Sequence, residues 1–273
     1  MLPLCQSKRI VAAEAYTTQL QAGLGLINET NTLMSLWSPG MSSSELFQTA
    51  LDSGQFPNVA ARRLRNIIAE CFRPRYMATD PDVVANLKLL QPVLTRAAFG
   101  QLLFLYTCRA NAILADFVHE VYWERYAGGY DLVSKQDAAD FINRAMDDGK
   151  TEKRWAESTV KRMGSYLLGA CADYGLLGKR SAEGRKIDSF RIEPNTVAYL
   201  AHDLHFQGLG DNTMIAHFDW QLFGLNAADV RDELKSLSRK GFLILQAAGD
   251  VTHIGWKHAT MKELVNVLIE RPA

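Results

Sequence analysis

The sequence has few cysteines, no long hydrophobic run and no excess of charge of either sign. Its four cysteines are widely separated and form no C-x-x-C pair, which is typical of reduced thiols rather than of a disulfide framework. The longest nearly uncharged apolar run, residues 97–108, spans twelve positions, whereas a transmembrane helix needs about twenty. The N-terminal residues turn basic before any apolar run develops, so we expect no secretory signal. These absences predict a cytoplasmic protein that makes no contact with a membrane.

Motifs of several enzyme classes are also missing. The chain contains no phosphate-binding loop of the form G-x-x-x-x-G-K-[ST], no G-x-S-x-G and no H-E-x-x-H. Asp219, Glu233 and Lys235 occur in the order used by one class of metal-dependent nucleases. On the helix expected at 226–240, however, the last two side chains would diverge. We therefore expect a protein that is not an enzyme and needs no cofactor.

Histidine is nearly absent before residue 200, and five of the six histidines follow it. His202 and His205 are three residues apart, which would place them on one helical face where both could ligate zinc. No cysteine accompanies them, and aromatic residues surround them in the sequence. We expect these histidines to be packed in a core or an interface, and we predict no metal site.

Charge of both signs is present in equal amounts, 30 basic and 30 acidic side chains, but it is segregated along the chain. Residues 150–191 hold ten lysines and arginines against five acids, whereas residues 110–148 hold three against eight. Residues 193–230 hold five acids and no lysine or arginine. Such blocks either attract one another within the fold or divide the surface between a nucleic-acid face and a protein-partner face.

Helical periodicity dominates, so we expect a mainly α, multi-helix globular protein with helix-turn-helix-like and winged-helix-like units that carry small β hairpins. Ser42 with Glu45, and Ser134 with Asp137, have the spacing that caps the start of a helix. Three units are expected: an N-terminal helical domain at 1–130 with a helix-turn-helix-like segment at 43–73, a winged-helix-like unit at 131–193, and a C-terminal helical unit at 194–273 with a winged-helix-like segment at 226–256.

The first candidate site is the segment 61–76, ARRLRNIIAECFRPRY, which holds five arginines and one glutamate. A helix at 59–73 would gather Leu64, Ile67 and Phe72 in one apolar sector and leave guanidinium groups outward. It follows a shorter helix and a Gly/Pro turn, as does the second helix of a helix-turn-helix. A guanidinium fork suits phosphate, because it can donate two parallel hydrogen bonds. We predict DNA contacts from the arginines of this segment: Arg62, Arg63, Arg65, Arg73 and Arg75.

The second candidate site is a helix at 155–174 followed by a hairpin. Val160, Met163 and Leu167 recur at spacings of three and four, so they would be buried and the early polar positions exposed. In a winged helix these positions would face the major groove, and the hairpin would lie beside it. We predict DNA contacts from exposed residues of this helix and hairpin: Ser158, Lys161, Arg162, Lys179, Arg180, Arg185 and Lys186.

Long stretches of the chain resemble the BrxA family of bacteriophage-exclusion (BREX) defence systems. These stretches are VAARRLRNIIAECFRPRY, CRANAILADFVHEVYW, WAEST, CADYGLL, AHDLHFQGLGD and HFDWQLFGL. The resemblance implies a non-enzymatic, DNA-binding protein with a helix-turn-helix and a basic groove. It also implies a place beside a site-specific DNA methyltransferase, a phosphatase-like protein and large ATPases. The family supplies no catalytic residues to carry over to this sequence.

Two hypotheses follow. The first is a DNA-binding accessory subunit of a BREX complex, monomeric when alone, that contacts duplex DNA through basic helix and wing surfaces. The second is a protein–protein scaffold of the same complex that does not touch DNA. In the second, the basic segments dock on acidic partners or pair with the acids of 110–148. The sequence leaves both open, and it does not say whether the basic units line one groove.

Overall fold

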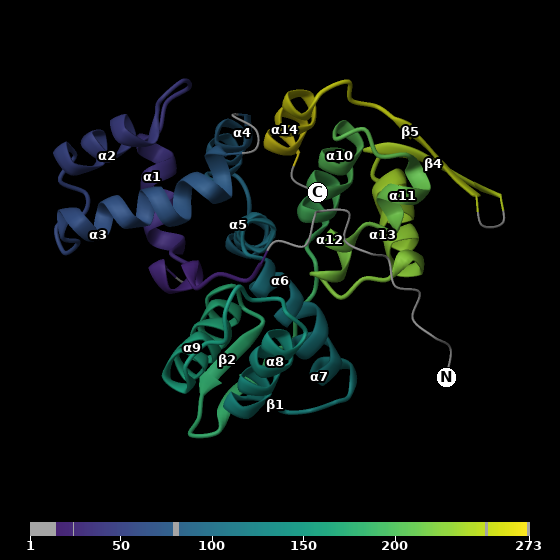
Figure 1. Cartoon of the computed structure of the whole chain (residues 1–273). Helices are drawn as coiled ribbons and strands as arrows, with labels where there is room; N and C mark the ends of the chain where they lie inside the picture. The colour runs from purple at the N-terminus through teal and green to yellow at the C-terminus, as the bar shows by residue number, and fades with distance from the viewer. Residues whose placement is uncertain (1–14, 24, 79–81, 249–250, 272–273) are drawn as a thin grey trace.

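The computed structural model describes residues 15–23, 25–78, 82–248 and 251–271, and it is mainly α with small antiparallel hairpins, as the sequence predicts. Figure 1 shows three groups of elements arranged around helix α5 (Arg96–Ala110). This helix is buried on nearly every side from Ala98 to Cys108, because the run is almost wholly apolar. No helix of the described residues is long and apolar enough to cross a bilayer.

The first group, at the left and top of Figure 1, contains the predicted helix-turn-helix-like segment. Its elements are η1 (Gln19–Ala22), α1 (Ile27–Leu36), α2 (Ser43–Asp52), α3 (Ala61–Asn66), η2 (Ile67–Met77) and α4 (Asp82–Leu90). The capping box between Ser42 and Glu45 forms and starts α2. Helix α3 runs directly into η2, a π-helix that contains Pro74, whose missing N–H cannot complete regular α-helical bonding. The helix expected at 59–73 is therefore longer and changes register after α3.

The second group lies at the bottom of Figure 1 and begins with a helix that is interrupted by a π-helical segment. Its elements are α6 (Ala112–Phe117), η3 (Val118–Tyr122), α7 (Trp123–Ala127), β1 (Leu132–Ser134), α8 (Lys135–Asp147), α9 (Glu157–Asp173), β2 (Leu177–Arg180) and β3 (Gly184–Ile187). The strands form an antiparallel sheet in the order β1-β3-β2. A Cβ at Gly184 would lie 2.1 Å from the carbonyl oxygen of Val133. Glycine is therefore needed for the close approach of β3 to β1.

The third group lies at the right of Figure 1. Its elements are α10 (Pro194–Phe206), α11 (Asp211–Ile215), α12 (Phe218–Gln221), α13 (Ala227–Arg239), β4 (Leu243–Ala248), β5 (Val251–Trp256) and α14 (Met261–Glu270). A capping box between Asn226 and Asp229 starts α13, and β4 pairs with β5 in an antiparallel hairpin. Helix α14 packs against both α10 and α4, so the last helix of the chain connects the third group to the first.

Arg109, near the end of α5, joins the central helix to the third group. Its Nη2 donates to Asp203 Oδ2 of α10 at 2.6 Å, and its Nε donates to Asp219 Oδ2 of α12 at 2.9 Å. Burial opposes the charge of Arg109, but Asp219 and Asp203 more than offset this and raise its pKa well above the usual value. One cation therefore serves two largely buried carboxylates.

Two hydroxyl contacts fix the neighbouring turn of α5 on both sides. The hydroxyls of Tyr106 and Tyr199 lie 2.8 Å apart, which links α5 to α10. The hydroxyls of Thr107 and Tyr174 lie 2.7 Å apart, which links α5 to the C-terminal end of α9. Buried polar groups must be hydrogen-bonded to avoid a desolvation penalty, so these pairs restrict how α5 can rotate between its neighbours.

Three of the four cysteines fall among the described residues, and all three are buried free thiols. Burial raises the pKa of Cys71 and raises that of Cys171 to about 12, so neither is a thiolate at neutral pH. Cys5 lies outside the described residues.

Three of the histidines that follow residue 200, His202, His205 and His258, pack among aromatic rings, as expected, whereas His253 is exposed. His202 of α10 is fully buried, with its ring 4.8 Å from Trp256 and 5.4 Å from His258. Its Nδ1 lies 2.8 Å from the carbonyl oxygen of Ala198, so Nδ1 is the protonated nitrogen in this geometry. Burial lowers the pKa of His202 to about 4. Among the described residues, no group of three or more His, Cys, Asp or Glu side chains could hold a metal ion.

Replacing Arg109 by leucine should destabilise the fold by about 3–5 kcal/mol, because Asp203 and Asp219 would remain buried without their cation. The matched control is Arg154→Leu, which breaks the pair with Asp147, where the two side chains are 69% and 62% exposed. That loss should be below about 1 kcal/mol. Urea unfolding of both variants measures the difference, and equal losses would contradict the role assigned to Arg109.

The stability of the fold should decrease as pH falls from about 6.5 towards 4. The unfolded chain gains a proton on His202 below about pH 6.5, while folded His202 gains one only near pH 4, so acid favours the unfolded state. The loss from this group is at most about 3 kcal/mol. In His202→Gln, the urea midpoint should depend less on pH across this range than in the wild type. In His253→Gln, where the side chain is exposed, the pH dependence of the midpoint should be unchanged. A slope unchanged in His202→Gln would exclude this explanation.

Candidate nucleic-acid interface

The structure places the residues predicted to contact DNA on two surfaces, except for Arg75, which is buried. The arginine face consists of exposed residues on α3 and η2: Arg62, Arg63, Arg65 and Arg73. The wing surface consists of residues on α9 and the β2–β3 hairpin: Ser158, Lys161, Arg162, Lys179, Arg180, Arg185 and Lys186. In Figure 1, α3 and this hairpin lie apart, on different groups of elements.

Three of the four guanidinium groups of the arginine face lack a carboxylate partner among the described residues. Arg62, Arg65 and Arg73 form no ion pair with any carboxylate of the described residues. The guanidinium carbon of Arg65 lies 4.8 Å from the ring centre of Phe47 of α2, which is within the range of a cation–π contact. These three arginines are therefore held outward, with their charge available to a partner.

Several acids of 110–148 pair instead with bases of the same part of the chain. Asp116 and Glu120 pair with Lys150 at 3.3 and 3.1 Å, and Asp137 pairs with Arg125. Burial opposes the charge of Lys150, but the two carboxylates outweigh it and raise its pKa. The internal pairing considered for Arg62, Arg65 and Arg73 is thus not seen.

Arg75 is a correction to the sequence prediction, because it is only 3% exposed. Its Nη2 donates to the carbonyl oxygen of Gly23 at 3.0 Å and its Nη1 to that of Gly25 at 3.5 Å. Arg75 follows Cys71 by four residues and Leu64 by eleven, which is the spacing of the buried stripe of this helix. The backbone carbonyls replace water around the cation, so Arg75 stabilises the fold and does not contact DNA.

On the wing surface, the predicted helix residues are exposed as expected. Ser158, Lys161 and Arg162 are exposed on α9. Lys161 Nζ lies 2.6 Å from Glu157 Oε1, but both side chains are more than 70% exposed. Such a pair is weak and easily exchanged for another anion. The helix can therefore offer both cations to a phosphate backbone.

The hairpin carries four basic residues in two different settings. Lys179, Arg180 and Lys186 are exposed. Arg185 is half-buried, and its Nη1 donates to the carbonyl oxygen of Gly178 at 3.1 Å. Arg180 and Arg185 are opposite one another in the β2–β3 ladder, so their charges are brought close together although five residues separate them.

A hollow of about 40 Å³ lies where the hairpin meets α8 and α9, and we call it the basic hollow. It is lined by Lys135, Ser165, Leu168, Arg180, Gly184 and Arg185. Sequence reasoning missed Lys135 and Ser165, because neither belongs to the hairpin. Two signals pointed to them: Lys135 is the first residue after the cap at Ser134, and Ser165 continues the exposed stripe of α9 by a step of three from Arg162.

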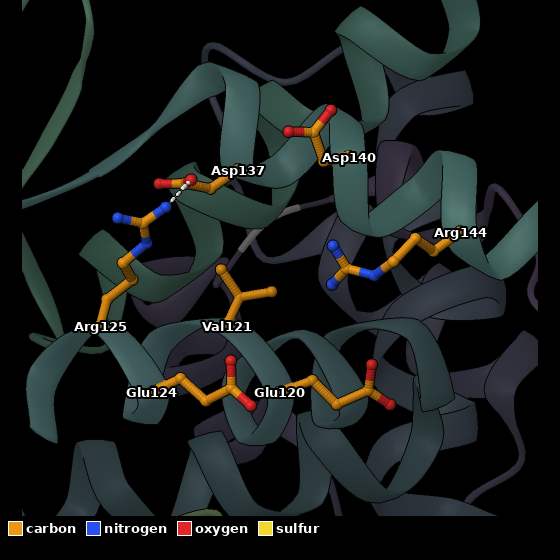
Figure 2. A pocket seen from close by; sticks show the side chains of 7 residues that line it. All are labelled: Glu120, Val121, Glu124, Arg125, Asp137, Asp140 and Arg144. Carbon is orange, nitrogen blue, oxygen red and sulfur yellow. Dashed lines mark hydrogen bonds and ion pairs between the residues drawn. The ribbon is translucent and has the colours of Figure 1, made fainter. Parts of the chain in front are cut away.

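A second hollow, of about 140 Å³, lies on the other side of α8, and we call it the acidic hollow. It is lined by Glu120, Val121, Glu124, Arg125, Asp137, Asp140 and Arg144. Figure 2 shows side chains of two helical segments facing one another across it, with Arg125 joined to Asp137. Four carboxylates and two guanidinium groups line it, so its charge is opposite to that of the basic hollow.

The C-terminal hairpin differs from β2–β3 in its charge. Strands β4 and β5 carry a single titratable side chain, His253, and β4 exposes Ile244. The unit predicted at 226–256 therefore has a helix and a hairpin in the expected order but lacks a basic wing in its strands.

Replacing Arg75 by alanine should destabilise the fold by about 2–4 kcal/mol, because the carbonyl oxygen of Gly23 would lose its Arg75 donor, that of Gly25 would keep only the Tyr174 hydroxyl, and a cavity would form. The exposed Arg73, two residues earlier in the sequence, provides the matched control. Arg73→Ala should change stability by no more than about 0.5 kcal/mol. Thermal and urea unfolding of the two variants would show the contrast, and a neutral Arg75→Ala would place this residue back among the candidates for DNA contact.

Comparison with known proteins agrees with the resemblance found in the sequence. A crystal structure of an uncharacterized protein from Magnetospirillum magneticum is similar to this chain, with a TM-score of 0.57 and 13% sequence identity. The similarity covers 77% of this chain and 98% of that chain, and at this identity it bears on the fold alone. A search of curated proteins finds no match. The family model for BrxA matches residues 14–203. Because that match spans more than half of the sequence, the chain belongs to the BrxA family.

Proposed function

We propose that this chain is a non-enzymatic, DNA-binding accessory subunit of a BREX phage-defence complex. The BrxA family supplies the BREX setting. Within it, the chain would bind duplex DNA with the unit 131–193, placing α9 in the major groove and the β2–β3 hairpin beside it. The observation that carries this proposal is the exposed basic surface formed jointly by α9 and that hairpin.

The order of elements in this unit supports the proposal. Strand β1, helices α8 and α9, and the β2–β3 hairpin follow one another, and the sheet order β1-β3-β2 places the first strand on β3. A winged helix has the same order of elements, and in it the second helix after the first strand is the reading helix. The exposed early positions of α9, Ser158, Lys161 and Arg162, are then the ones that meet base edges and phosphates.

The charge distribution supports the same orientation. Arg162, Arg180 and Lys186 are exposed cations on one unit of a chain whose net charge is zero. Two acids of the preceding segment, Asp116 and Glu120, pair with Lys150. Neutralised acids repel a duplex less than free ones do, so the wing surface can attract phosphates although the whole molecule is neutral.

The arginine face would provide a second contact with DNA. Arg62, Arg65 and Arg73 lack carboxylate partners among the described residues, and a guanidinium group binds phosphate with two parallel hydrogen bonds. Because α3 and the hairpin lie apart in Figure 1, the two surfaces would touch different stretches of the backbone.

The binding of a labelled duplex should weaken with salt, with a log–log slope near −5 if about six phosphates are neutralised. Replacing Arg162 and Lys186 together by alanine should make the slope shallower by about 2, one unit for each lost phosphate contact. The matched control is Arg239→Ala with Lys240→Ala, two exposed residues of the third group that change the net charge equally. Fluorescence anisotropy over a range of salt concentrations measures all three proteins.

The outcomes separate the two hypotheses. Equal slopes in the two double variants would indicate a general charge effect and contradict a specific wing contact. No affinity for duplex even at low salt would leave the scaffold, for which the acidic hollow, with its four carboxylates, is the observation in favour. In that case, replacing Glu124 and Asp140 together should weaken pull-down of other members of the complex.

A further inference from the structure

The basic hollow is lined only by cations, a hydroxyl, a glycine and one apolar side chain. Lys135, Arg180 and Arg185 provide three positive charges, and no carboxylate lines it. In a chain with equal numbers of acids and bases, a concave site with charge of one sign is a binding feature rather than an average piece of surface. Its positive charge favours the binding of an anion.

The cations of the hollow are held in place by the protein itself. Lys135 Nζ donates to the carbonyl oxygen of Ala182 at 2.9 Å, and Arg185 Nη1 donates to that of Gly178 at 3.1 Å. An ammonium group has three donors and a guanidinium group five, so each retains N–H groups for a ligand. Arg180 forms no ion pair with a carboxylate of the described residues.

The backbone around the hollow is also fixed. Gly184 pairs with Ser134 in the β1–β3 ladder, and a Cβ there would strike the carbonyl oxygen of Val133. This close approach holds Arg185, the next residue, near Lys135, which follows Ser134. The positive charges are therefore already close together before an anion binds, which reduces the entropic cost of binding.

The size of the hollow selects the kind of anion. A volume of about 40 Å³ admits a few groups of the size of water. This is enough for oxygens of one phosphate group that enters from the open side. Ser165 lines the hollow, but its hydroxyl already donates to the carbonyl oxygen of Lys161, so the cations are the principal donors.

The position of the hollow indicates where that phosphate comes from. Ser158, Arg162 and Ser165 are exposed at spacings of four and three along one face of α9. The hollow lies at the end of this stripe, between the helix and the hairpin. When a helix occupies the major groove, the phosphates that border the groove pass beside it.

We propose that the basic hollow binds one phosphate of the DNA backbone and thereby sets the register of α9 along the groove. This inference rests on the proposed function, because it names the ligand of the same unit. Lys135 and Arg185 would be fixed donors, and Arg180 would close over the phosphate from the exposed side. A single anchored phosphate positions a protein along the duplex without reading its sequence.

The test is a phosphate-by-phosphate interference experiment on intact protein and duplex. A set of duplexes, each with one neutral methylphosphonate linkage, is titrated against the wild type, Arg180→Ala and Lys179→Ala. Lys179 is the matched control, because it neighbours Arg180 on β2, is equally exposed, and does not line the hollow. Arg180→Gln provides a second variant, and thermal unfolding of each variant checks the fold.

At one linkage, neutralisation should weaken wild-type binding and make the salt slope shallower by about 1. At that linkage Arg180→Ala should show less than half of the wild-type loss, because its contact is already gone, whereas Lys179→Ala should show all of it. A different result is that the loss of affinity from Arg180→Ala adds in full to the loss at every neutral linkage, while unmodified duplex still binds. That result would exclude phosphate binding by the basic hollow and leave the proposed function intact. Absence of duplex binding by the wild type at low salt would overturn both.

Discussion

The two ion pairs of Arg109 constrain the whole molecule. Helix α5 is buried and largely apolar, so the polar contacts near its C-terminal end contribute strongly to its orientation. There one guanidinium group holds carboxylates from α10 and α12 at 2.6 and 2.9 Å. The hydroxyl pairs of Tyr106 with Tyr199 and of Thr107 with Tyr174 fix the same turn from two sides. The second and third groups of elements are therefore positioned relative to one helix, and so are the surfaces they carry.

Local pairing of the acids explains how a neutral chain keeps basic surfaces available. The acids of 110–148 are close to Arg125 and Lys150, and these bases neutralise several of them across short distances. Among the described residues, no ion pair joins those acids to Arg62, Arg65 or Arg73, or to the cations of the β2–β3 hairpin. Helix α8 consequently separates two hollows of opposite charge. Segregation of charge along the sequence becomes segregation on the surface because the pairing is mostly local.

The parts of the fold that the sequence predicted are those determined by neighbouring residues. Capping boxes at Ser42, Ser134 and Asn226 form because their partners lie three residues ahead. Arg75 was assigned wrongly: its spacing places it on the buried stripe of its helix, but the carbonyl groups that allow a cation to be buried there lie about fifty residues away in the sequence. The basic hollow was missed in part for the same reason, since Lys135 and Ser165 join the hairpin only through tertiary packing. The distribution of charge along the chain could be predicted from the sequence. Which charged residues from different elements come together in the fold could not.

The packing of α14 against both α4 and α10 has a mechanical consequence. It joins the third group directly to the first, so these two groups are connected through α14 as well as through α5. The arginine face and the wing surface then keep a constant separation and orientation relative to one another. A duplex that touches both must fit the angle between them, so the curvature of the bound DNA would be set by side chains packed in the interior of the protein.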